Sequence, residues 1–180
     1  MRHQVARGRI SLMSDDQRFD DLYQANESFA ASFTDGGIPA RAARGLAVVT
    51  CMDSRLDPFH ILGIGPGDAK ILRNAGARVT EDVLRTLVLA CYLLDVNRVL
   101  VMPHTGCRMV GASESDIHRL IQQQFGVDTR SLEFRTATDQ EAALRNDVTR
   151  IRSYPLLPDD LAIVGAVFDV KTGRLGQPVH

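Results

Sequence analysis

Five residues in two short segments have the side-chain types of a metal site. Residues 45–58 read GLAVVTCMDSRLDP, so an apolar run ends in Cys51, Asp53 and Arg55, each two positions apart. An extended segment would project all three toward one side. Residues 104–107 read HTGC, which places His104 and Cys107 three apart across a glycine-containing turn. Two thiolates and an imidazole form a soft ligand set that favours zinc, with a carboxylate nearby.

The number of strong ligands predicts a catalytic zinc rather than a structural one. Structural zinc is usually closed by four Cys or His ligands, whereas catalytic zinc keeps one position open for water and lowers the pKa of that water toward ~7. Two thiolates weaken zinc as a Lewis acid, so Asp53 is expected to orient the nucleophile while Arg55 holds the carboxylate. In an alternative closed form, Asp53 itself binds zinc and displaces the nucleophile. This competition predicts that activity falls below about neutral pH.

Apolar patterns around these residues predict alternating strands and helices. Short apolar runs at 46–50, 69–73 and 98–102 are typical of strands covered on both faces. A later run, 161–170, predicts a strand that leads to an edge or a hairpin. Helical spacing predicts an amphipathic helix from Ser14 to about Phe33, a second helix within 79–96 with Thr80 as its N-cap, and further helices at 111–124 and 138–152.

This alternation predicts an α/β fold with a mostly parallel central sheet and helices on both faces. Ligands of such sheets bind outside the carboxyl ends of the strands. Three predicted strands end in CMDSR, NAG and PHTGC, so their polar residues are expected at one edge. Backbone groups of Asn74, Ala75 and Gly76 are candidates for the substrate pocket, although a plain tight turn explains them equally well. Gly106 either brings the backbone close to the metal or simply makes its turn.

Composition suggests one globular domain with a small-molecule partner. The chain has 180 residues, of which 1–13 are expected to be a disordered tail and 14–180 a single domain. Its 21 basic and 22 acidic residues nearly cancel, which gives no argument for nucleic acid or a membrane surface. No apolar stretch reaches the ~20 residues of a bilayer span, and the N-terminus lacks a secretory pattern, so a cytoplasmic location is expected.

The quoted motifs resemble those of the β-class carbonic anhydrases. CMDSRLDP, ILRNAGA and HTGC carry the resemblance, which extends through PARAARGLAVV and LAIVGAVFDVKTGRL and covers about residues 14–176. It implies a zinc ion bound by Cys51, His104 and Cys107, with Asp53 and Arg55 as the catalytic dyad, in a homodimer or dimer of dimers. One departure is Arg108, where the family usually has glycine.

The resulting hypothesis is a zinc-dependent carbonate dehydratase that converts carbon dioxide reversibly to bicarbonate and a proton. A hydrolase of carbonyl sulfide or carbon disulfide on the same zinc site is an alternative, because relatives with these ligands perform that chemistry. A non-catalytic zinc-stabilised module, with Asp53 as a permanent fourth ligand, is another. Cys91 is expected in the core, whereas His60 and His118 are expected to be surface or packing residues.

Overall fold

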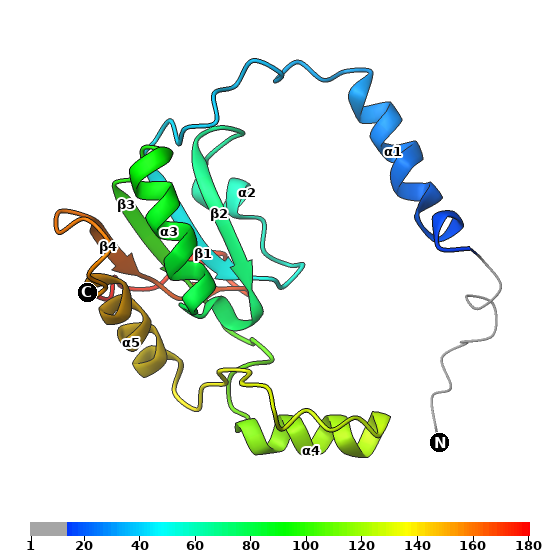
Figure 1. Ribbon diagram of the computed structural model, residues 1–180, viewed down its shortest axis with the longest axis vertical. Helices are drawn as coiled ribbons and strands as arrows, with labels where there is room; N and C mark the ends of the chain where they lie inside the picture. The colour runs from blue at the N-terminus through cyan, green and yellow to red at the C-terminus, as the bar shows by residue number, and fades with distance from the viewer. Residues whose placement is uncertain (1–13) are drawn as a thin grey trace. The chain divides into compact units, whose positions relative to one another are not determined.

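The computed structural model describes residues 14–180, which divide into one unit up to residue 38 and a second unit of residues 39–180. The predicted tail, 1–13, lies outside the described residues. The first unit holds a 3-10 turn, η2 (Asp16–Phe19), and helix α1 (Asp20–Ala30), labelled in Figure 1. The helix predicted from Ser14 to about Phe33 is therefore confirmed over a shorter span, and no residue of α1 is buried. Its apolar side chains, including Tyr23 and Phe29, are exposed.

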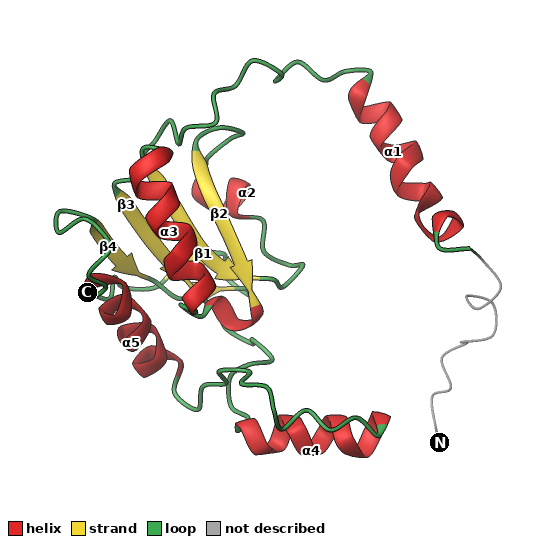
Figure 2. Ribbon diagram, in the orientation of Figure 1, coloured by secondary structure: helices red, strands yellow, loops and turns green. Residues whose placement is uncertain are grey.

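Four parallel strands form the sheet of the second unit, in the order β2-β1-β3-β4. The strands are β1 (Leu46–Cys51), β2 (Ala69–Asn74), β3 (Arg98–Met102) and β4 (Ala162–Gly165), and they are yellow in Figure 2. Cys51 pairs with Asn74, and Thr50 pairs with both Arg73 and Met102. The carboxyl ends of β1, β2 and β3 thus lie at one edge, as the parallel α/β prediction requires.

Two helices, α3 (Glu81–Leu93) and α5 (Gln140–Arg152), cover one face of the sheet. The side chain of Thr80 accepts a hydrogen bond from the backbone N–H of Val83, which confirms the predicted cap of α3. Leu84 and Leu87 of α3, with Leu144 and Val148 of α5, join the main core. That core also contains the strand residues Ala47, Val49, Val99, Val101 and Ile163.

The other face is covered at its carboxyl half by helix α2 (Pro58–Leu62), which the sequence patterns did not predict. Asp57 caps this helix by accepting hydrogen bonds from the backbone N–H groups of Phe59 and His60, and Gly63, with φ of 58°, ends it. Ile61 and Leu62 then pack against the smaller core cluster. This cluster includes Val48, Cys51, Leu56, Met102, Cys107 and Phe168.

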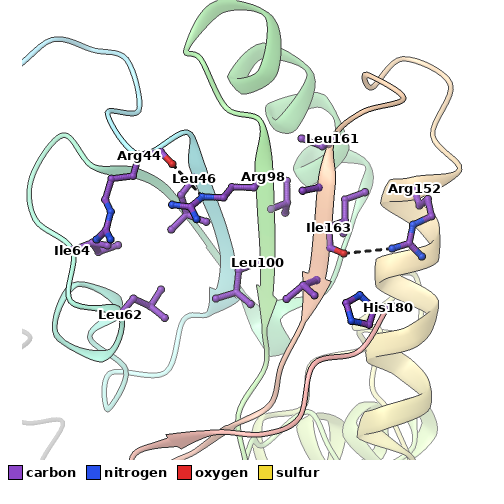
Figure 3. A pocket seen from close by; sticks show the side chains of 13 residues that line it. Arg44, Leu46, Leu62, Ile64, Arg98, Leu100, Arg152, Leu161, Ile163 and His180 are labelled. Atoms are coloured by element: carbon purple, nitrogen blue, oxygen red, sulfur yellow. Dashed lines mark hydrogen bonds between the residues drawn. The ribbon is translucent and has the colours of Figure 1, made fainter.

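The amino half of the same face is a groove of about 680 Å³ (Figure 3). Figure 3 shows Leu46, Leu62 and Leu100 among its lining side chains, together with basic side chains. Its lining residues are Arg44, Leu46, Leu62, Ile64, Arg98, Val99, Leu100, Arg152, Leu161, Ala162, Ile163, Val164 and His180. Three arginines and no acidic side chain occur among them, so this apolar groove, called here the sheet groove, is bordered by positively charged side chains.

The remaining elements are the 3-10 turn η3 (Ala75–Ala77), helix α4 (Glu114–Phe125) and a short antiparallel hairpin of β5 (Phe168–Asp169) with β6 (Arg174–Leu175). Ser113 begins α4 through a reciprocal capping box with Asp116, so the helix starts three residues later than the predicted 111–124. The predicted late strand, 161–170, is divided between β4 and the hairpin. No helix in the described part of the chain is long and apolar enough to cross a bilayer.

Candidate metal centre

Cys51, His104 and Cys107 come together at the carboxyl edge of the sheet. Cys51 is the last residue of β1, and the other two lie in the loop that follows β3. Their candidate ligand atoms all lie within 4.8 Å of one another, and all three residues are buried. The two Sγ atoms are 3.9 Å apart. The structure therefore brings together the three residues that the sequence predicts as ligands.

The local geometry fits a soft divalent metal. His104 Nδ1 lies 3.0 Å from the carbonyl oxygen of Thr105, so this nitrogen must donate its proton and Nε2 carries the lone pair. Among the described residues, Nε2 is the buried side-chain atom that has no hydrogen-bond partner. A buried orphan of this kind is costly unless something else binds it. Tetrahedral zinc with sulfur at about 2.3 Å would separate two thiolates by roughly 3.8 Å, close to the spacing found.

Asp53 and Arg55 form a bidentate ion pair beside these ligands. Arg55 donates from Nε to Oδ1 at 2.9 Å and from Nη2 to Oδ2 at 2.7 Å, and its backbone N–H also bonds Oδ1 at 3.0 Å. These bonds from Arg55 hold the pKa of the Asp53 carboxyl well below its usual range. Arg55 Nη2 donates to the carbonyl oxygen of Gly106 at 3.2 Å. This bond connects the pair to the loop after β3 that carries His104, Cys107 and Met109, called here the metal loop.

The way in which Arg55 reaches Asp53 differs from the expectation. Residues 53–56 form a turn in which the Leu56 N–H bonds the Asp53 carbonyl oxygen at 3.1 Å. The predicted extended projection was therefore wrong for Arg55, which the turn brings back to the carboxylate. Asp53 Oδ2 also lies 3.7 Å from His104 Nε2, so the carboxylate borders the candidate metal position.

Two side chains that the sequence analysis did not assign to the site hold its backbone. Arg73 donates from Nε to the carbonyl oxygen of Cys51 at 3.0 Å and from Nη2 to that of Asp53 at 2.7 Å. Gln140 Nε2 donates to the carbonyl oxygen of His104 at 2.7 Å. The strand register that sets Arg73 beside Thr50, one residue before Cys51, could not be read from the sequence.

The segment after β2 lies against the candidate ligands. The Asn74 side chain bonds both backbone groups of Arg78, accepting from its N–H at 2.9 Å and donating to its carbonyl oxygen at 2.7 Å. Ala75 is partly buried, and the N–H of Gly76 points to Cys51 Sγ at 3.4 Å. Gly106 has φ of 66° and faces Arg55 with its carbonyl oxygen. Gly76 thus contacts Cys51 and Gly106 contacts Arg55, while the role of all four residues in a substrate pocket stays a prediction.

Other sequence candidates lie away from the three ligands. Cys91 is partly buried and packs against the main core, and burial raises the pKa of its thiol. His60 bonds Asp57 at the exposed start of α2. His118 Nδ1 lies 2.9 Å from Thr129 Oγ1, and its ring contacts that of Phe134. Arg108 is exposed and lines a cavity of about 550 Å³ that also touches Gly106 and Cys107.

Comparisons with known proteins agree with this geometry. A sequence model described as "Carbonic anhydrase" matches residues 46–175. "Beta-carbonic anhydrase 1" of Mycobacterium tuberculosis is 36% identical over 159 residues, which cover 88% of this chain and 96% of that protein. The crystal structure of a carbonic anhydrase from Streptococcus mutans superposes with a TM-score of 0.84 at 36% identity, covering 94% of this chain and 99% of that one. A carbon disulfide hydrolase of Acidianus sp. is 31% identical over 166 residues, covering 79% of this chain and 80% of that protein.

Proposed function

Because the chain belongs to the carbonic anhydrase family, we propose that it hydrates carbon dioxide reversibly to bicarbonate and a proton at a zinc centre. Cys51, His104 and Cys107 would hold the metal. The observation that carries this proposal is the orphaned Nε2 of His104, which is buried between two thiols beside an arginine-bound carboxylate. Stopped-flow measurement of carbon dioxide hydration on protein of known zinc content tests it directly.

The described side chains divide the catalytic work between them. Zinc in this position would act as a Lewis acid that supplies hydroxide at neutral pH. Asp53 would accept a hydrogen bond from the attacking oxygen and orient it toward carbon dioxide. Arg55 keeps the carboxylate ionised and fixes its direction through the two side-chain bonds. Backbone groups of Asn74, Ala75, Gly76 and Gly106 would line the substrate pocket.

The Asp53–Arg55 ion pair corresponds to the open form of the site, in which the carboxylate leaves the metal free. In the closed form, Asp53 would leave Arg55 and become the fourth ligand. The distance of 3.7 Å from its Oδ2 to His104 Nε2 supports this alternative, since only a small movement separates the two positions. We propose that the two forms exchange with pH.

Activity is expected to fall as the pH drops below about neutral. Bonds from Arg55 hold the pKa of Asp53 below its ordinary value of 3.8, so this carboxylate stays ionised throughout mildly acidic solution. The acid limb must therefore report protonation of the nucleophile, with kcat/KM dropping about tenfold per pH unit below the transition. Stopped-flow rates from alkaline to mildly acidic pH measure this limb. A flat profile over that range would contradict the proposed pH switch.

Hydrolysis of carbon disulfide or carbonyl sulfide is the second candidate function. Its support is the similarity to the Acidianus hydrolase, at 31% identity. Both substrates resemble carbon dioxide in shape and present an electrophilic carbon to the same nucleophile. Sulfide release from each substrate, measured beside carbon dioxide hydration on one preparation, distinguishes the two functions.

We also propose that the protein assembles as a homodimer or a dimer of dimers, with a second copy covering the sheet groove. The groove has an apolar floor and three arginines, whereas α1 exposes apolar side chains next to Asp20, Asp21 and Glu27. Helix α1 of a second copy therefore offers the matching chemistry. The groove is accessible, and no residue of α1 is buried.

Reversing the charge of Arg98 is expected to weaken this assembly. Arg98→Glu would place a carboxylate at the groove opposite the acidic helix, so the dissociation constant should rise about tenfold or more. Sedimentation velocity over a dilution series measures the change. Arg145→Glu, on the exposed side of α5 and outside the groove, is the matched control and should leave assembly intact. Equal behaviour of the two variants would place the interface elsewhere.

Two further expectations are proposed with this function. Residues 14–180 are proposed to act as one β-carbonic anhydrase-like domain, which the 88% coverage by the mycobacterial relative supports. A cytoplasmic location is proposed because Cys51, Cys91 and Cys107 are free thiols, and a reducing compartment keeps ligand thiols available for a metal.

A further inference from the structure

The turn after β2 places one backbone N–H on a candidate metal ligand by means of an unusual conformation. Gly76 and Ala77 of η3 (Ala75–Ala77) both have positive φ, of 83° and 59°. Gly76 suits its position doubly, because a Cβ there would also lie 3.1 Å from Met109 Cβ. Ala77 has no such freedom, and a residue with a Cβ adopts this conformation only where its surroundings hold it. The result is the 3.4 Å contact between the Gly76 N–H and Cys51 Sγ.

A shielded ion pair between Arg78 and Asp147 anchors this turn to helix α5. Arg78 donates from Nε to Asp147 Oδ2 at 2.6 Å and from Nη2 to Oδ1 at 3.4 Å. Its Nη1 donates to the carbonyl oxygen of Arg135 at 2.8 Å. The side chains of Arg78 and Asp147 are only 18% and 7% exposed, so the pair is shielded from solvent. The Asn74 side chain also hydrogen-bonds both backbone groups of Arg78, which closes the turn around Gly76.

The space beside the turn leaves it little room to relax. Gly76, Ala77, Arg78 and Asp147 line a cavity of about 10 Å³, which is at most enough for one water molecule. The turn is therefore fixed between α5, which carries Asp147, and the metal loop, which carries Met109. Since the turn has so little free space beside it, a change in the ion pair is expected to move the Gly76 N–H.

A hydrogen bond to a thiolate withdraws charge from sulfur and so reduces what the sulfur donates to a bound metal. Groups that contact metal ligands without touching the metal typically change metal affinity or activity by about 10- to 100-fold when removed. Arg78 and Asp147 are not among the candidate ligands. They can reach Cys51 only through the backbone of the turn.

We propose that Arg78 and Asp147 are positioning residues that hold the Gly76 N–H against Cys51 Sγ and thereby set the donor strength of that thiolate. The inference rests on the proposed metal site and extends it to a part of the molecule that the catalytic dyad does not touch. A purely structural ion pair would contribute to folding stability and leave the sulfur unaffected.

Cobalt-loaded protein tests the proposal through the thiolate-to-cobalt charge-transfer band. Asp147→Asn keeps the size of the side chain but removes its charge, so the turn should loosen and the band should move to longer wavelength. Amide hydrogen exchange at Gly76 should accelerate about tenfold or more. Arg78→Lys should shift the band in the same direction. Glu81→Gln is the matched control, because it breaks an exposed ion pair between Glu81 of α3 and Arg150, which lies on α5 as Asp147 does. This variant should change none of these quantities.

A lower melting temperature with an unchanged band and unchanged exchange at Gly76 would overturn the proposal. If neither variant folds, NMR of the wild-type protein loaded with ¹¹³Cd provides the test. Scalar coupling between the Gly76 amide proton and cadmium is expected, and its absence would overturn the proposal. Failure of the wild-type protein to bind cobalt or zinc would instead contradict the proposed function. Normal metal binding and turnover, together with an unchanged charge-transfer band in both variants, would contradict this inference alone.

Discussion

Replacing Asp53 with alanine is expected to lower kcat/KM for carbon dioxide hydration about 100- to 10,000-fold while zinc remains bound. The three proposed ligands do not include Asp53 in the open form, because both carboxylate oxygens are bonded by Arg55. Without the carboxylate, nothing on Arg55 can accept a hydrogen bond from the attacking oxygen. Stopped-flow rates and zinc stoichiometry on the same preparation measure these two consequences, and a thermal melt shows whether the variant keeps its fold.

The chain contains a matched control for this variant. Asp128 and Arg130 repeat the same Asp-x-Arg arrangement, with bonds of 3.0 and 2.7 Å between their side chains and 3.1 Å from the Arg130 N–H. This second pair is not part of the metal-ligand group, so Asp128→Ala should retain full activity. Loss of zinc and of the fold in Asp53→Ala would favour a non-catalytic zinc module. Retained activity would remove Asp53 from the mechanism.

Cys107→Ser is expected to abolish both zinc binding and turnover. A serine hydroxyl stays protonated at neutral pH and is a poor ligand, so two of three strong ligands remain. Zinc stoichiometry should fall from near one to near zero, with kcat/KM at least about 1,000-fold lower, since the metal supplies the nucleophile. Metal analysis after dialysis against a weak chelator, followed by the hydration assay, gives both values.

Cys91→Ser provides the comparison for that variant, since Cys91 is partly buried on α3 and packs against the core. It removes a thiol without touching the metal centre. Unchanged zinc content and activity are expected, with a small loss of stability. If Cys107→Ser kept zinc and activity, the proposed ligand set would be wrong.

Most strands and helices of the fold could be predicted from local patterns of apolar residues in the sequence. The runs at 46–50, 69–73 and 98–102 became strands with boundaries extended by at most one residue. Helix α2 was missed because five residues are too few for a helical period, although Asp57, Pro58 and Gly63 carry its start and stop signals. The late run 161–170 looked like one strand because nothing local shows that Gly165 bonds Val179 near the C-terminus.

The grouping of the candidate ligands Cys51, His104 and Cys107 was predictable for a different reason, namely that parallel strands bring their carboxyl ends to one edge. The supports of the site were not predictable, because each depends on pairings between distant residues. Arg73 acts across the strand register, and Arg78 meets Asp147 from 69 positions away. Sequence spacing describes neighbours along the chain, whereas these contacts depend on how β2 and α5 pack in three dimensions.

The sheet groove has a practical consequence for measurements on this protein. Turnover of a fast hydratase is recorded at nanomolar protein, whereas melting curves need micromolar protein. If a second copy closes the groove (Figure 3), these two experiments sample different positions on one association curve, and mass action makes the apparent stability depend on dilution. Specific activity should then be compared between variants only at matched subunit concentration.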